Sequence, residues 1–419
     1  MSVRSLAIFF ALALATESLA RAQDPNAVLP ERLTLPVLLQ LVAERSPRLA
    51  AERVAIDAAE AERVTAGVLP NPTVSFGRFK PAGGANTLFE GSSQQQSTVD
   101  FPLLIAGQRG ARIEAAEQGM LATRARVGLA GNELALRAAG LFVGLQAAQE
   151  KVTVLQESRG DIERAAAIVS GRLDSGMASR YDLARVEVEL AGVTVRMEEA
   201  RDDRANQAAG LATLIGAPGW RPSAIGTPVP AGLLTDAAVW RNPLASGNSQ
   251  IRAARREEDA AQAALQRTER ERWPVPVLSL GRSWTSDPFG AANFVGLSTE
   301  IPLLDTRRGP LAKAKADLQA AQRRREAIES EAGVELLRLL DSLAQRRAAL
   351  EQFEQKVGTR IPALKQMAED AYRLGRGSIL ELIDAARSRL DARLTNVDLR
   401  AALVQQELRI KALTGTLGE

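Results

Sequence analysis

Proline placement constrains this chain more than any other feature, because proline is strongly unfavourable inside an α-helix. No proline occurs in residues 103–217, and Pro362 is the only one in residues 311–419. Both stretches are rich in Ala, Arg, Glu and Leu, so we expect each to fold into a long helical hairpin. A helix over about 109–173 would be roughly 100 Å long at ~1.5 Å per residue. Pro362 should kink or break the second long helix.

The composition favours long helices packed closely side by side. Alanine occupies 73 of the 419 positions, whereas aromatic residues make up only 4% of the chain and charged residues 25%. Small side chains let helices approach closely, and few aromatics are left to build an ordinary large core. The last stretch also repeats apolar residues every seven positions, with others four residues after three of them. These residues are Ile383, Leu390, Val397 and Val404, then Leu394, Ala401 and Leu408. A solvated amphipathic helix of a spectrin-like bundle would show the same spacing.

The absence of cysteine and histidine excludes several classes of function. No disulfide framework, Cys/His metal site or histidine general base can exist in this chain. The sequence also shows no phosphate-binding loop and no nucleophile elbow. Lys plus Arg total 53 and Asp plus Glu total 50, a balance that argues against nucleic acid as a partner. We therefore expect no enzyme, no metal site and no cofactor.

The first 22 residues have the features of a secretory signal peptide. Arg4 provides a basic flank, residues 6–15 form a short apolar run, and Ala20 and Ala22 place small side chains at the −3 and −1 positions. Cleavage is expected before Gln23. The apolar run is shorter than the ~20 residues that a spanning helix needs. No other stretch has 18 consecutive apolar residues. An exported chain without cysteine suits a bacterial envelope.

The chain shows an internal repeat with a period near 200 residues. We expect a first repeat over 23–216, a linker with four prolines over 217–241 and a second repeat over 242–419. Five pairs of short motifs recur in the same order. They are Ser46-Pro47 with Asn242-Pro243, 69–72 with 273–276, 100–104 with 300–304, Leu173/Gly176/Ser179/Asp182 with Tyr372/Gly375/Ser378/Glu381, and 214–216 with 413–415.

Each repeat contains two short stretches in which apolar and polar residues alternate, which predicts β-strands. These four stretches are 73–79, 97–101, 277–284 and 293–301. The alternation fits the wall of a membrane β-barrel, and it fits a half-buried soluble hairpin equally well. The segments between the strands, 81–96 and 285–292, are rich in Gly, Ser, Gln and Asn. Four strands cannot close a barrel, so several chains would have to share one if the strands cross a membrane.

In order and duplicated, these motifs resemble the outer-membrane efflux protein family, the TolC-like channels. The resemblance rests on the Leu-Pro-Asn-Pro motif at 69–72, on the Pro-Leu-Leu motifs at 102–104 and 302–304, and on the turn at 372–384. It implies a mainly α fold with a small β-barrel part, in which long antiparallel helical hairpins form an α-barrel and each chain adds four transmembrane strands. It also implies a homotrimer in the outer membrane of a Gram-negative cell, spanning into the periplasm.

The resemblance further implies a passive exit duct for tripartite efflux or type I secretion. Its partners would be outer-membrane lipid, a periplasmic adaptor protein and an inner-membrane pump, which in many such systems is of the RND type. The motif at 300–305 is most similar to the heavy-metal cation branch, although drugs, solvents and peptides stay open as substrates. The alternative interpretation is a periplasmic coiled-coil adaptor or scaffold protein.

The two hairpin turns carry the residues of interest. Gly176 and Gly375 allow the positive φ of a tight connection between helices. Ser179 and Ser378 are placed as N-caps, and an acidic residue follows each three positions later, which predicts two capping boxes. Those acidic residues are Asp182 and Glu381.

The resemblance adds functional roles at these turns. It places the turns at the periplasmic tip, where the adaptor docks on a surface that includes Gly176, Ser179, Gly375, Gly377 and Ser378. Glu381 and Asp384 match acidic rings at the constriction. Tyr372 matches a tyrosine that ties the tip shut to an acidic residue on the neighbouring hairpin, here Asp182. Gly377 stands where the family has a gating arginine, and Arg376 lies one residue earlier.

The arginine runs of the chain are interpreted as solvated helix faces. They are Arg255-Arg256, Arg323-Arg324-Arg325 and Arg346-Arg347.

Overall fold

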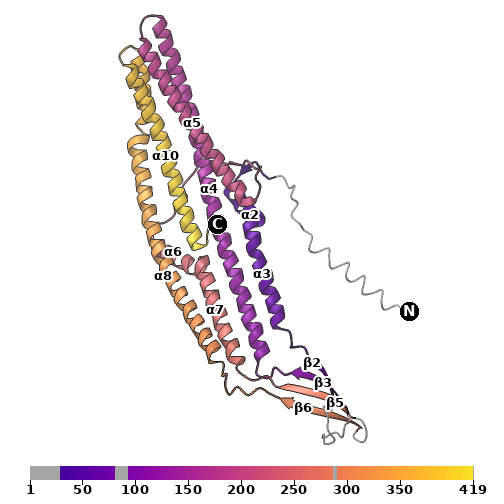
Figure 1. The fold of residues 1–419 in the computed structure, drawn as a ribbon. Coiled ribbons are helices and arrows are strands. Elements are labelled where there is room, and N and C mark those ends of the chain that lie inside the picture. The colour runs from indigo at the N-terminus through magenta and orange to yellow at the C-terminus, as the bar shows by residue number, and fades with distance from the viewer. Residues whose placement is uncertain (1–28, 81–92, 286–289, 419) are drawn as a thin grey trace, which may run out of the picture.

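The computed structural model describes residues 29–80, 93–285 and 290–418, and it shows one elongated molecule. A four-stranded sheet lies at one end, the two helical hairpin turns lie at the other, and helices connect the two ends (Figure 1). The expected signal peptide at 1–22 lies outside the described residues, as do residues 81–92 and 286–289 of the two segments between the strands.

Two long helical hairpins form the body of the molecule, as proline placement predicts. The first consists of α4 (Gln108–Asp174) and α5 (Arg180–Ile215). The second consists of α8 (Arg308–Phe353), a π-helical segment η1 (Glu354–Gly358), α9 (Ile361–Arg373) and α10 (Ile379–Thr414).

Pro362 lies in the first turn of α9, so the predicted interruption of the second long helix is confirmed. Proline is tolerated there because the N–H that it lacks would have no partner within the helix.

Shorter helices precede each strand pair. They are α2 (Leu35–Arg45) and α3 (Pro47–Ala66) in the first half, and α6 (Ala237–Gly247) and α7 (Ser249–Arg270) in the second. A short parallel pair, β1 (Arg32–Leu33) with β4 (Ser223–Ala224), joins the start of the chain to the segment after α5.

The structure corrects one predicted correspondence between the two halves. Ser46 is the residue shared by the end of α2 and the start of α3, and Asn248 has this position between α6 and α7. The expected counterpart Asn242-Pro243 is wrong, because Pro243 lies inside α6. Ser46 and Asn248 have the same extended backbone conformation, but Ser46 makes no side-chain cap and is followed by Pro47 at the first helical position, whereas Asn248 caps its helix. Asn248 provides this cap by accepting a hydrogen bond from the backbone N–H of Ile251 at 2.8 Å.

The sheet is antiparallel with the order β2-β3-β5-β6. Its strands are β2 (Thr73–Phe79), β3 (Gln94–Pro102), β5 (Val277–Thr285) and β6 (Gly290–Ser298). All four predicted strands exist, but β3 begins three residues earlier and ends one residue later than expected, and β6 begins and ends three residues earlier. Its last residue, Ser298, pairs with Val277, the first residue of β5. Pro276 precedes Val277 and has no N–H to donate, so the ladder ends there.

Helix α4 is the central element of the fold. It packs against α3 and α7 toward the sheet and against α5 and α10 toward the turns. An apolar cluster near the turns contains buried residues from α4, α5, α9 and α10. Within the described part of the chain, no helix combines the length and the apolar character that crossing a membrane requires.

Candidate functional site

Glycine shapes both hairpin turns, as predicted. Gly176 has a φ of 74° and Gly375 a φ of 71°, values that other residues adopt only with strain. Gly377 is needed for a different reason. A Cβ atom added there would lie 3.1 Å from the Cβ of Ala371 and 3.0 Å from Oε2 of Glu381. The second turn therefore leaves little room for a side chain at the position where an arginine is expected from the resemblance.

Both predicted capping boxes are confirmed. The backbone N–H of Asp182 donates to Oγ of Ser179 at 3.1 Å, and the backbone N–H of Ser179 donates to the Asp182 carboxylate at 2.8 Å. The same reciprocal pair joins Ser378 and Glu381, with both hydrogen bonds at 3.3 Å. Two of the acidic side chains singled out in the sequence thus stabilise the first turns of their own helices.

Tyr372 is buried at the contact between the two hairpins, with 5% of its surface exposed. The Arg172 guanidinium lies 4.7 Å from the centroid of its ring, and Nη1 of Arg172 donates to the Tyr372 carbonyl oxygen at 3.0 Å. Among the residues that the structure describes, no hydrogen bond joins Tyr372 to Asp182. Arg172 is therefore a partner of Tyr372 that sequence reasoning missed.

Asp384 is exposed one turn after Glu381 on α10. It lies close enough to Arg387 to contribute, with Asp391, to raising the pKa of that guanidinium. The main cause of the raised pKa is the hydrogen bond that Arg387 donates to Glu189 at 2.6 Å. Within the described ranges, no three acidic side chains gather closely enough to hold a metal ion.

A ladder of ion pairs joins the two hairpins. Glu150, Glu157 and Asp161 on α4 pair with Arg400, Arg393 and Arg389 on α10. The carboxylates are spaced by seven and then four residues along α4, and the arginines are spaced equally in the reverse direction along α10. This spacing keeps the antiparallel helices in register. Sequence reasoning missed the ladder because the partners lie more than 200 residues apart.

One further pair joins α5 to α10. Glu189 is buried, with 7% of its surface exposed, and its carboxylate accepts hydrogen bonds from Arg387. The pair of Arg196 with Asp391, at 2.9 Å, lies on the same two helices but is largely exposed. Only the first of these pairs removes a carboxylate from water, so it should contribute more to holding the hairpins together.

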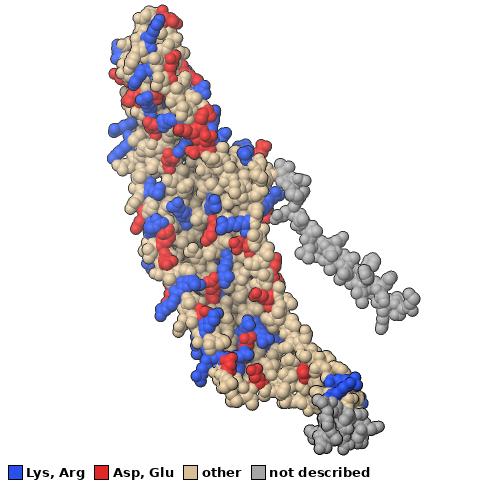
Figure 2. Space-filling model, viewed as in Figure 1, with Lys and Arg blue, Asp and Glu red and all other residues tan. Residues whose placement is uncertain are grey.

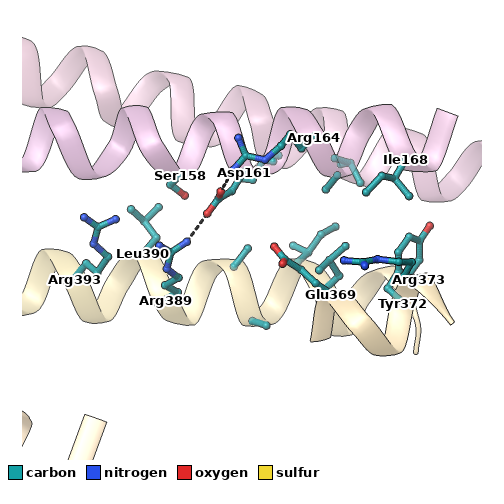
Figure 3. Close-up of a pocket in the computed structure, with 17 residues that line it drawn as sticks. Ser158, Asp161, Arg164, Ile168, Glu369, Tyr372, Arg373, Arg389, Leu390 and Arg393 are labelled. Carbon is teal, nitrogen blue, oxygen red and sulfur yellow. Dashed lines mark hydrogen bonds and ion pairs between the residues drawn. The ribbon is translucent and has the colours of Figure 1, made fainter. Parts of the chain in front are cut away.

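A cleft of about 240 Å³ lies between α4 and the α9–α10 segment, near the turns. Figure 3 shows Asp161 on α4 between Arg164 and Arg389, with Glu369, Tyr372 and Arg373 farther along. Apolar side chains form most of its walls, including Ile162, Ile168, Leu382 and Ile383. The cleft leaves space at the contact between the two hairpins.

The arginine runs are more varied than expected. Arg323 is 83% exposed, as predicted for a solvated face, but Arg325 is only 28% exposed and pairs with Glu258 at 2.6 Å and Glu329 at 2.9 Å. Burial acts to raise the pKa of Glu329, but hydrogen bonds from Arg255 and Arg325 outweigh it and lower that pKa. Arg325 therefore joins α7 to α8. Positive charges lie close to negative ones over the face of the molecule shown in Figure 2.

At the opposite end of the molecule, the two faces of the sheet differ. One face exposes a band of apolar side chains: Val74, Phe76, Leu280, Val295 and Leu297 are 41–75% exposed. The register places Val74, Val99, Leu280 and Val295 in one row across all four strands. The other face carries mainly Thr, Ser, Gln and Gly side chains. An exposed apolar band of this kind marks a surface that contacts another protein or a membrane.

The comparisons with known proteins agree with these observations. The family model described as outer membrane efflux protein matches residues 38–217 and 240–416. The chain is 25% identical over 398 residues to the cobalt-zinc-cadmium resistance protein CzcC of Cupriavidus metallidurans, covering 91% of this chain and 90% of that protein. It is 28% identical over 307 residues to the nickel and cobalt resistance protein CnrC of the same organism, covering 71% of each.

Solved structures share the fold. The outer membrane protein VceC from Vibrio cholerae superposes with a TM-score of 0.73 at 18% sequence identity. The match covers 92% of this chain and 97% of that one.

Proposed function

Because the chain belongs to the outer membrane efflux protein family, we propose that it is the outer-membrane exit duct of a tripartite efflux system. The observation that carries this proposal is the exposed apolar face of the sheet, which lies at one end of a long helical body. A sheet of this kind fits the outer membrane, and helices as long as the 67-residue α4 fit a tube that extends into the periplasm.

Three copies of the chain complete the duct. The sheet of one chain has two outer strands, β2 and β6, whose free edges cannot be left unpaired in lipid. Joining β6 of one copy to β2 of the next closes a barrel to which each chain gives four strands. The apolar face then contacts lipid, and the polar face lines the lumen.

The turns form the periplasmic tip of the duct. Three copies bring Glu381 and Asp384 around one axis as a ring of carboxylates, and Tyr372 and Asp182 help to hold the resting tip closed. Arg376, beside Gly377, is the candidate for the cationic partner of this constriction. A periplasmic adaptor docks on the surface that includes Gly176, Ser179, Gly375, Gly377 and Ser378, and it connects the duct to an inner-membrane pump of the RND type.

The closure at the tip is tested by single-channel conductance in planar bilayers. Replacing Tyr372 with Phe and Asp182 with Ala in one protein should raise the conductance, because the double variant loses the groups proposed to hold the tip shut. A conductance equal to that of the wild type would contradict this role.

The cargo is proposed from the relatives. The names of CzcC and CnrC assign resistance to cobalt, zinc, cadmium and nickel to those proteins. We extend the chemical class, divalent transition-metal cations, to this chain. In a duct of this kind the pump selects the cargo, and the duct must accept it.

A deletion strain tests this function. It should lose tolerance to at least one of these cations and accumulate the metal in the cell, and the full chain expressed in trans should reverse both effects. The empty vector is the control. If the deletion strain kept its metal tolerance and metal content but became sensitive to antibiotics, cations would be ruled out and drugs would be the cargo.

A further inference from the structure

The polar face of the sheet carries a single ionisable side chain among the described residues of its strands, that of Asp100. Successive side chains in a strand point to opposite faces, and residues paired directly across an antiparallel sheet share a face. The register therefore places Asp100 in one row with Thr73, Ser279 and Gly296. The two arginines of the strands, Arg78 and Arg282, fall on the opposite face.

The Asp100 carboxylate is held in place without a cationic partner. Oγ of Ser279 donates a hydrogen bond to Oδ1 of Asp100 at 2.6 Å. Over the described ranges of the chain, no Lys or Arg forms an ion pair with it. By contrast, many acidic side chains on the helices pair with an arginine, including Glu150, Glu157, Asp161 and Glu189. Among the described residues, no cationic side chain is therefore placed to neutralise the negative charge of Asp100.

The position of Asp100 on β3 determines to which side of the sheet its carboxylate points. Its neighbours along β3, Val99 and Phe101, lie on the face with the apolar band, which the proposed function assigns to lipid. Asp100 then points into the lumen, near the end of the sheet that adjoins the helices. Three copies place three carboxylates around the duct axis, at the opposite end of the molecule from the hairpin turns (Figure 1).

We propose that Asp100 is a residue that determines charge selectivity, making the membrane end of the duct favour hydrated cations over anions. A ring of carboxylates raises the local concentration of cations and lowers that of anions in the water that it surrounds. This inference rests on the proposed function. It adds a second ring of carboxylates to the one proposed at the tip, so that a cation meets a favourable potential at both ends of the duct.

The test uses the full-length protein in planar lipid bilayers with a KCl gradient. The reversal potential gives the permeability ratio of K⁺ to Cl⁻. Asp100→Asn removes the charge and keeps an oxygen that accepts the hydrogen bond from Ser279, so the barrel should be preserved. We expect this variant to lower the permeability ratio by about twofold or more, since a unit charge in the wall of an aqueous pore changes the energies of passing ions by a sizeable fraction of RT.

Asp236→Asn is the matched control. Asp236 is the N-cap of α6, far from the sheet, and accepts a hydrogen bond from the backbone N–H of Ala238 at 2.9 Å. Asn caps a helix as well as Asp does, so the control removes one carboxylate per chain and keeps the fold. Its permeability ratio should equal that of the wild type.

Two further variants keep the proposal testable if Asp100→Asn fails to insert. Asp100→Glu retains the charge and should retain the ratio, and Thr73→Asp adds a carboxylate to the same row and should raise it. Channels of Asp100→Asn with the wild-type ratio, or Thr73→Asp channels with no increase, would overturn the inference and leave the proposed function standing. A wild-type protein that forms no channels would overturn the proposed function as well.

Discussion

The two hairpins have the same turn but different long helices. In both, a glycine with positive φ is followed three residues later by a serine N-cap, and an acidic residue completes a capping box. In the first hairpin, α4 runs for 67 residues without a break. In the second, the corresponding path is divided by the five-residue π-helical segment η1 and by Pro362 at the start of α9.

The comparison shows that the turn geometry and the continuity of the long helix have different determinants in the sequence. The turn depends on a few neighbouring residues, and it forms in both hairpins because both contain them. Helix continuity depends on single breaking residues and on support from the surrounding helices. The part of α4 near the turns is packed against both α5 and α10, whereas α9 packs mainly against α10. The segment from η1 to the second turn therefore has less support from neighbouring helices than the corresponding part of α4.

Introducing a proline into the long helix of the first hairpin should have the largest effect on the stability of the protein. Glu163 of α4 is at the position that corresponds to Pro362 in the 199-residue offset of the turns, and about half of its side chain is exposed. Glu163→Pro should destabilise the protein by about 3 kcal/mol or more, because proline in a helix interior removes one hydrogen bond and clashes with the carbonyl of the residue four positions earlier. Guanidinium unfolding of the detergent-solubilised protein, followed by far-UV circular dichroism, measures the loss.

Glu163→Ala is the control for this variant. It removes only the exposed pair of Arg159 with Glu163, which contributes at most about 0.5 kcal/mol. If the proline variant lost no more stability than the alanine variant, α4 would not need to be continuous. The difference in helix continuity between the two hairpins would then not affect the free energy of unfolding.

The next largest effect is expected at the contact between the hairpins. Arg387→Ala leaves the buried Glu189 carboxylate without its partner and should cost about 2 kcal/mol, below the full value for a buried pair because Arg387 itself is half exposed. Asp391→Ala breaks the exposed pair with Arg196 and should cost less than about 1 kcal/mol. Equal shifts of the denaturation midpoint in the two variants would show that burial of Glu189 does not matter.

The smallest loss of stability is expected from substitutions that test whether the two turns are equivalent. Gly176→Ala and Gly375→Ala each force a Cβ atom into the left-handed region and should each cost about 1 kcal/mol. Thermal unfolding of the two variants should give similar decreases in melting temperature. A decrease at one turn only would show that the two turns, despite their common geometry, do not contribute equally to the stability of the protein.

Much of this hairpin geometry could be predicted from the sequence, because it is local. Gly176, Ser179 and Asp182 specify a turn through contacts within seven residues, and Pro362 acts on the helix that contains it. The partners across the hairpins could not be predicted. Tyr372 of α9 contacts Arg172, and Arg389 of α10 contacts Asp161, only because α9 and α10 pack against α4 in one particular register.

The sheet shows the same division. Alternation identified the four strands, but the pairing of β3 with β5 joins segments from the two halves of the chain, and only the folded structure brings Ser279 to Asp100. The correspondence of Ser46 with Asn248 was also missed. The two junctions have different sequences, a serine followed by proline and an asparagine followed by serine, yet both start a helix.

The central claim, that three chains form one duct in the outer membrane, is tested most directly by fractionation followed by mass determination. The protein should sediment with the outer membrane, require detergent for extraction and have the mass of three processed chains by native mass spectrometry. A protein recovered as a single chain from the periplasm without detergent would contradict the claim and would favour a periplasmic scaffold.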